Sequence, residues 1–141
     1  MYVASRPPAA PPGPATLRLP YAPESARAAR QMVRAKLQEW NLPHLVDDAE
    51  LIVSELVGNA AKTGCMTALV VGVRRPTENL VRLLVADGSR TLPVRIDAGP
   101  AAESGRGLDL VDLVTKGRWG AQLRPLGKLV HADLATRPTA A

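Results

Sequence analysis

One apolar segment constrains this chain more than any other, because it carries a carboxylate and a carboxamide in its middle. It covers residues 46–63, with the sequence VDDAELIVSELVGNAAKT. Apolar residues recur at intervals of three and four, which is the spacing of a helix with one buried stripe. These residues are Val46, Ala49, Val53, Leu56, Val57 and Ala60. The segment therefore predicts a long helix packed against the core of a domain.

Two polar residues share one face of this predicted helix. Glu55 and Asn59 are four positions apart, so their side chains stand one above the other. Together with Asp48 and Lys62 they form a stripe that offers acceptors and a cation. Polar groups that border apolar residues need partners. The stripe therefore favours a binding or catalytic role, and the alternative is the solvated edge of an amphipathic helix.

Length and composition fit one aliphatic domain. The chain has 141 residues, 46% of them hydrophobic, with no Phe and 3% aromatic residues, so the core must consist mainly of Leu, Val and Ala. A single cysteine, Cys65, cannot form an internal disulfide, which favours a reducing compartment. No apolar run is long enough to span a membrane, and residues 1–15 lack the apolar centre of a signal peptide. We therefore expect a soluble, cytoplasmic protein without a membrane partner.

The chain is basic, with a formal net charge of +5. This charge raises nucleic acid as a partner. The basic residues are dispersed, however, and two Trp and two Tyr leave few aromatic side chains for stacking on bases. Nucleotide phosphate or an acidic protein surface explains the excess charge equally well, so nucleic acid is the less favoured alternative.

The order of the predicted elements indicates the fold class. Residues 1–15 are rich in proline and predict a disordered arm, residues 16–136 form the domain, and residues 137–141 form a tail. The predicted elements are an edge strand 16–20, a helix 24–40, the long helix 46–63, hairpin strands 67–74 and 80–86, a loop 88–104, a helix 108–114, and closing strands 118–123 and 128–134. This order predicts an α+β two-layer sandwich, in which helices cover one face of a mixed, mostly antiparallel sheet.

Two further motifs follow the long helix. Asp87 and Ser89 enclose a glycine directly after a predicted strand, where a loop can turn side chains towards a pocket. Taken alone, this motif is more often a simple turn. Later, Gly105, Arg106 and Gly107 precede Leu108 at the start of a predicted helix. Free N–H groups and the helix dipole suit phosphate there, and the alternative is a plain loop-to-helix joint.

The three motifs together resemble a known family. Residues 55–62, E-L-V-G-N-A-A-K, are similar to the N box of the GHKL (Bergerat-fold) ATP-binding proteins, and the Asp-Gly-Ser and Gly-Arg-Gly-Leu motifs follow in the family's order. The family includes gyrase-type ATPases, Hsp90, histidine kinases and anti-sigma-factor serine/threonine kinases. The small size and the lack of a sensor or dimerisation helix resemble the RsbW-like, anti-sigma branch.

The resemblance implies a role for each motif. It implies that Glu55 is the general base, that Asn59 holds Mg²⁺, and that Asp87 accepts a hydrogen bond from the adenine amino group. It also implies a lid near the phosphates, and the full set of implied cofactor-binding residues is Asn59, Lys62, Asp87, Ser89, Gly105, Arg106, Gly107 and Leu108. The chain departs from the family at Ser89 and Thr91, where the family has Gly, and at Leu129, which appears in place of a Thr that binds water near adenine.

The function implied by the resemblance is that of an ATP–Mg²⁺-binding regulator of transcription. It implies a serine/threonine protein kinase that acts on an anti-sigma antagonist, with a sigma factor or that antagonist as the protein partner. In this branch an Arg of the first helix contacts the sigma factor, and both Arg27 and Arg30 are candidates. The alternative is a protein-binding module without phosphoryl transfer, controlled by nucleotide or independent of it. The oligomeric state stays open, with a homodimer among the alternatives.

Overall fold

The computed structural model describes residues 13–22, 24–62, 68–88 and 106–137. The elements, in order, are β1 (Ala15–Pro20), α1 (Glu24–Glu39), the 3₁₀ turn η1 (Pro43–Leu45), α2 (Val46–Lys62), β2 (Ala68–Thr77), β3 (Leu80–Asp87), α3 (Arg106–Thr115), β4 (Trp119–Arg124) and β5 (Gly127–Ala135). No helix in these ranges is both long enough and apolar enough to cross a membrane.

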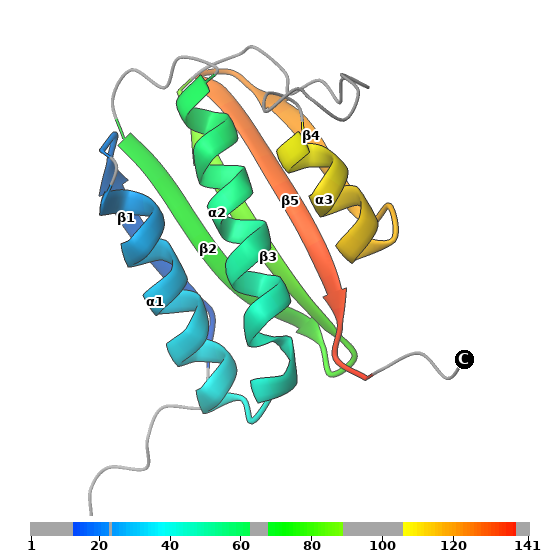
Figure 1. The fold of residues 1–141 in the computed structure, drawn as a ribbon. Coiled ribbons are helices and arrows are strands. Elements are labelled where there is room, and N and C mark those ends of the chain that lie inside the picture. The colour runs from blue at the N-terminus through cyan, green and yellow to red at the C-terminus, as the bar shows by residue number, and fades with distance from the viewer. Residues whose placement is uncertain (1–12, 23, 63–67, 89–105, 138–141) are drawn as a thin grey trace, which may run out of the picture.

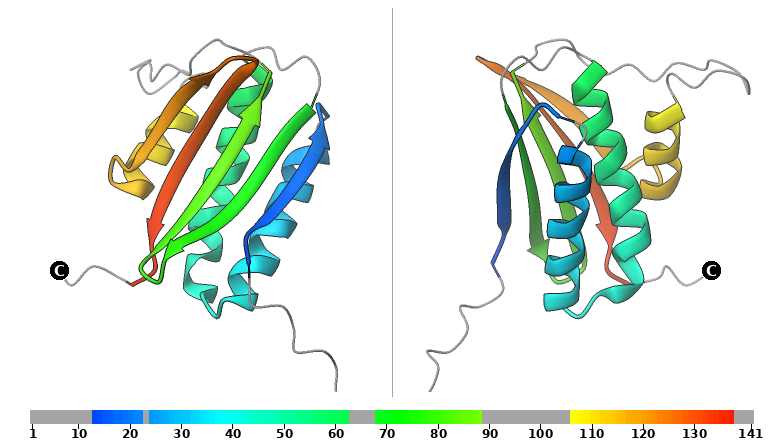
Figure 2. Two further views of the ribbon diagram at one scale, coloured as in Figure 1. Left: turned by 180° about the vertical axis from the view of Figure 1, so that it is seen from behind. Right: turned by 60° about the vertical axis from the view of Figure 1, so that its left-hand side comes forward.

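The protein has two layers, a sheet and a set of helices. The strand order is β1-β2-β3-β5-β4, and the helices cover one face with α2 between α1 and α3 (Figure 1). Seen from behind, the opposite face of the sheet carries no helix (Figure 2). The predicted α+β sandwich is therefore confirmed. Each ladder between the described strands is antiparallel, so the sheet shows none of the parallel pairing that a mixed sheet would have.

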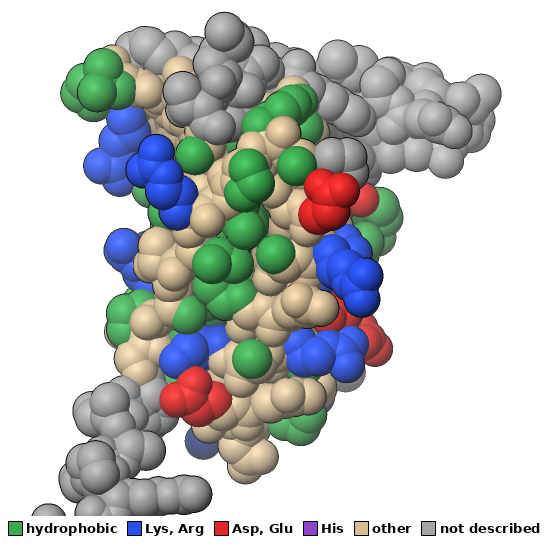
Figure 3. All heavy atoms as spheres, turned by 90° about the vertical axis from the view of Figure 1, so that its left-hand side faces the viewer, with side chains coloured by type: hydrophobic (Ala, Val, Ile, Leu, Met, Phe, Trp, Pro, Cys, Tyr) green, Lys and Arg blue, Asp and Glu red, His purple; other side chains and the backbone are tan. Residues whose placement is uncertain are grey.

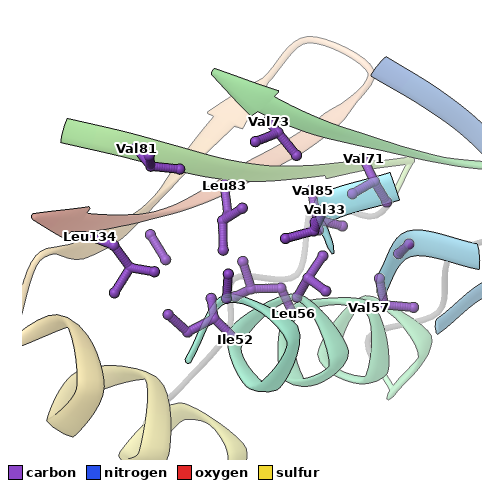
Figure 4. Packing of buried hydrophobic residues seen from close by; sticks show 14 of the residues in the cluster. Val33, Ile52, Leu56, Val57, Val71, Val73, Val81, Leu83, Val85 and Leu134 are labelled. Atoms are coloured by element: carbon purple, nitrogen blue, oxygen red, sulfur yellow. The ribbon is translucent and has the colours of Figure 1, made fainter. Parts of the chain in front are cut away.

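The core lies between α2 and the middle of the sheet. Every member of the apolar stripe predicted from the sequence is buried, and Ile52 joins it. Figure 4 shows side chains of α2 and of the strands projecting into one aliphatic layer. On β3 the residues Val81, Leu83 and Val85 face this layer, as the two-residue period of a strand requires.

The predicted helices and strands are confirmed, and one boundary differs by more than two residues. The hairpin turn was predicted over residues 75–79, but β2 continues to Thr77 and the turn occupies residues 78 and 79. The register shifts between Arg74 and Thr77. Such a bulge accommodates Pro76, which cannot donate to a regular ladder. The helix stop predicted at Gly64 lies outside the described residues.

Candidate functional site

Several predicted site residues meet at one end of the molecule. The last turn of α2, the end of β3, the start of α3 and the β4–β5 hairpin share this end (Figure 1). Asn59 lies in that last turn of α2, and Asp87 is the final residue of β3. Because α2 and β3 both end here, the fold brings together Asn59 and Asp87, which are about thirty positions apart in sequence.

Glu55 and Asn59 form the helical half of this site. Both are partly exposed, and one helical turn separates them, a rise of about 6 Å along the axis. Asp48 was predicted on the same stripe but lies about two turns nearer the helix start. It is exposed and lines a separate cavity of about 270 Å³ with His44 and Arg118. Asp48 therefore does not belong to the site, and only the C-terminal part of the predicted stripe does.

The strand half of the site contains a buried ion pair. Asp87 is opposite Lys128 in the β3–β5 register. Lys128 Nζ lies 3.1 Å from Asp87 Oδ1 and 3.0 Å from Asp87 Oδ2. Both side chains have an exposed fraction of 0%. The carboxylate that the resemblance assigns to adenine is therefore held by a cation of the same chain.

Lys128 was not predicted as a site residue, although the sequence contained a signal for it. It is in phase with Val130, Ala132 and Leu134, which face the helices. A lysine in phase with three apolar residues of a strand indicates a buried cation, which needs an anion nearby. The resemblance placed Leu129 near the adenine, and the structure corrects this placement. Its side chain lines a cavity with Thr16, Gly72 and Leu84 on the face without helices, so Lys128, not Leu129, stands beside Asp87.

The hairpin closes tightly over the same pair. A Cβ on Gly127 would lie 1.9 Å from the carbonyl oxygen of Asp87 and 3.0 Å from Gly88 Cα. These atoms belong to backbone, which cannot move aside as a flexible side chain can. Glycine is therefore required at position 127 for β5 to approach the end of β3.

The comparisons with known proteins give one match that decides the fold. The structure of the RsbU and RsbW domains of Rv1364c from Mycobacterium tuberculosis aligns with a TM-score of 0.66 and 22% identity, over 89% of this chain and 33% of that chain. This match shows that the chain shares its two-layer α+β fold with that structure, as the resemblance implied. It spans about a third of the length of that two-domain structure. The mycobacterial sensor histidine kinase MprB aligns with a TM-score of 0.48 and 19% identity, over 89% of this chain and all of that chain, 100%. No family model matches the sequence, and no curated protein matches it.

The predicted lid falls largely outside the described residues. Ser89 and Gly105 lie in segments that are not described, as does most of the predicted lid 88–107. Lys62 ends α2, and Arg106 and Gly107 open α3, but their side chains are not described. The side chain of Leu108 is buried with an exposed fraction of 4%, so its contribution to a phosphate would come from its backbone N–H.

The basic face of α1 is mostly committed to contacts within the chain. On this side of the molecule, Lys and Arg side chains are interspersed with hydrophobic and acidic ones (Figure 3). Arg30 donates to Ser54 at 3.0 Å, Arg34 donates to Glu50 at 2.9 and 3.2 Å, and Lys36 pairs with Glu39 at 2.8 Å. The hydrogen bond from Arg34 lowers the pKa of Glu50 below its ordinary value. Arg27 is exposed, and within the described ranges it makes neither a hydrogen bond nor an ion pair. It is the guanidinium on this face that remains available to a partner.

The two halves of the site differ in how well they fit ATP–Mg²⁺. Magnesium is usually held by one or two protein side chains together with phosphate oxygens and waters, and the side-chain oxygen of Asn59 suits this role. The described part of the chain has no cluster of three or more His, Cys, Asp or Glu residues for a metal, so phosphate would have to complete the coordination. The adenine half fits less well, because Lys128 donates to Asp87 Oδ1 and its ammonium also lies 3.0 Å from Oδ2.

Proposed function

We propose that this protein is an ATP–Mg²⁺-binding regulatory protein that acts on a protein partner in the manner of an anti-sigma factor. The observation that carries the proposal is the pair Glu55 and Asn59, one turn apart near the end of α2 in a GHKL-type fold. The end of β3 and the start of α3 lie at the same end of the molecule (Figure 1). A carboxylate, a carboxamide and a helix N-terminus are the groups that phosphoryl transfer requires of a protein.

Each group would have its own task. Asn59 would hold Mg²⁺ through its side-chain oxygen, and the first N–H groups of α3 would face phosphate. When bound, ATP–Mg²⁺ would supply the γ-phosphoryl group and leave as ADP. Glu55 would accept the proton that a serine or threonine hydroxyl of the partner, an anti-sigma antagonist, releases on attack.

The partner surface would lie on α1. Arg27 is exposed there, whereas Arg30 is held by Ser54. We therefore assign the contact with a sigma factor or antagonist to Arg27. Arg27→Ala should weaken binding to such a partner, and Arg34→Ala, which removes an equal charge that already pairs with Glu50, is the matched control.

A second function remains supported by one observation. The ion pair of Asp87 with Lys128 places a cation where an adenine amino group would donate. This favours a protein-binding module that docks on its partner without phosphoryl transfer.

Calorimetric titration tests the proposal. Wild-type protein should bind ATP and ADP, and Asn59→Ala should weaken binding chiefly when Mg²⁺ is present. Glu55→Gln cannot take up a proton, so binding should persist while transfer to the partner falls by about 10²-fold or more. Asp48→Asn, an equivalent change of an exposed carboxylate on the same helix, should leave both unchanged. Binding of ATP without labelling of any partner would favour the binding module, and no nucleotide binding would overturn the proposal.

A further inference from the structure

Lys128 is the feature of the site that neither the motifs nor the fold explain. Its side chain is completely buried, and it is charged, whereas its three in-phase neighbours on β5 are apolar. A pair of apolar residues at positions 87 and 128 would fill this space without the cost of removing two charges from water. A gain in stability therefore does not explain why this position carries a salt bridge.

The chemistry of the pair bears directly on base recognition. A purine presents an amino group at its 6-position in adenine and a carbonyl oxygen in guanine. A carboxylate accepts from the amino group and repels the carbonyl oxygen. Lys128 Nζ donates to Asp87 Oδ1 and lies 3.0 Å from Oδ2, so an adenine amino group would approach a carboxylate whose charge is already neutralised by an ammonium. The ammonium weakens the carboxylate as an acceptor and repels the partial positive charge of a second donor.

We propose that Lys128 determines base selectivity by holding Asp87, so that the wild-type protein does not distinguish ATP from GTP. This inference rests on the proposed nucleotide binding and adds to it which contacts provide the affinity. Phosphate and Mg²⁺ bind at the α2 and α3 end, and the base contributes little. The residue at position 128 is thus the specificity-determining residue of the site.

Lys128→Thr is the change that tests this assignment. Threonine suits a strand, retains a hydroxyl donor for Asp87 and removes the cation together with most of the side-chain volume. Affinities for ATP and GTP, both with Mg²⁺, are measured by titration on full-length wild-type and variant protein. Circular dichroism and thermal unfolding establish that the variant is folded. Lys128→Met, which keeps the length of the side chain, replaces the threonine variant if the latter fails to fold.

The expected result has two parts. Wild-type protein binds ATP and GTP with affinities equal within about a factor of two, a difference far below that of one hydrogen bond. The variant binds ATP about tenfold or more tightly than wild type does, with GTP little changed, because a hydrogen bond to a charged acceptor is worth that factor. Lys36→Thr removes an equal charge from α1, at an ion pair with Glu39, and should show the wild-type ratio.

The other outcomes separate this inference from the proposed function. A wild-type preference for ATP, or an unchanged ratio in the Lys128 variant, overturns the role of Lys128 while nucleotide binding stands. Absence of binding of either nucleotide to any of the folded proteins overturns the proposed function and this inference together.

Discussion

Two ion pairs join the same two strands, β3 and β5, and lie on opposite faces of the sheet. Asp87–Lys128 and Arg82–Asp133 are both cross-strand partners of β3 and β5. Asp87 and Arg82 are five positions apart on β3, an odd number, so the two pairs project to opposite faces of the sheet. The side chains of Asp87 and Lys128 are 0% exposed, whereas those of Arg82 and Asp133 are 37% and 12% exposed.

The difference indicates that solvent exposure, not hydrogen-bond geometry, determines how much stability is lost when one partner of a pair is removed. The geometry of the outer pair is the better of the two, since Arg82 donates from Nε and Nη2 to the two oxygens of Asp133 at 2.8 and 3.0 Å. This hydrogen bonding raises the pKa of the Arg82 guanidinium further above its ordinary value. Water nevertheless solvates either partner when the other is removed. The side chains of the inner pair are 0% exposed, so bulk solvent cannot stabilise either charge when its partner is removed.

Breaking the inner pair should therefore have the largest effect on stability. Lys128→Met leaves the Asp87 carboxylate enclosed without its cation, and we expect a loss of about 3–5 kcal/mol in the free energy of unfolding. Adding Asp87→Asn should recover most of that loss, because the double variant buries no charge. Urea unfolding of both single variants and the double variant gives the coupling between them. Independent, additive losses would show that the pair is not coupled.

Gly127 allows the start of β5 to lie close to the end of β3, where the inner pair forms. Gly127→Ala would force a Cβ into contact with the Asp87 carbonyl oxygen, at 1.9 Å in the present backbone. We expect a loss of about 1–3 kcal/mol, as for overpacking in a core. Gly58→Ala is the matched control, since nothing lies within 4 Å of its Cβ. In the interior of α2 it should stabilise the protein by about 0.5–1 kcal/mol. Equal unfolding midpoints for the two variants would contradict the close approach.

The fold was predictable because its determinants are local and periodic. The stripe on α2, the helical spacing on α1 and the alternation on β3 each identify an element without knowledge of the others. The bulge before Thr77 was missed, since Pro76 was taken as a turn residue and a bulge depends on the partner strand. Boundaries depend on tertiary pairing in this way, whereas the existence of the elements does not.

The site was only half predictable from the sequence. Glu55 and Asn59 are one turn apart on a single helix, so their relation follows from spacing alone. The relation of Asp87 to Lys128 requires the register between two strands that are joined by α3 and β4. The burial of Lys128 could be predicted from its phase on β5, but its pairing with Asp87 could not. The resemblance directed attention to Leu129, one position away and therefore on the other face.

Removal of the outer pair should cost far less than removal of the inner pair. Arg82→Met leaves Asp133 next to solvent, and we expect a loss of about 0.2–1 kcal/mol in the free energy of unfolding. Because exposed charges are screened, the loss should shrink further as salt is added. Urea unfolding at low and high salt measures both effects. A loss as large as that of Lys128→Met would mean that burial does not distinguish the two faces.

A third ion pair, on the helices instead of the sheet, should give the smallest effect and one that depends on pH. Arg34 of α1 donates to Glu50 of α2, and the side chain of Arg34 is 52% exposed.

The hydrogen bond from Arg34, its main cause, lowers the pKa of Glu50 below the ordinary value of 4.5. A lowered pKa means that the pair contributes stability in full above 4.5, and that this contribution disappears as the pH falls through the pKa of the folded state.

Arg34→Gln removes the pair, so wild type and variant should differ slightly in urea midpoint at neutral pH and converge in acid. The same titration on Arg27→Gln is the control, because Arg27 is a charge of α1 that makes neither a hydrogen bond nor an ion pair within the described ranges. A difference between wild type and Arg34→Gln that persists undiminished in acid would show that Arg34 acts through packing of its stem on α2 and not through the charge of Glu50.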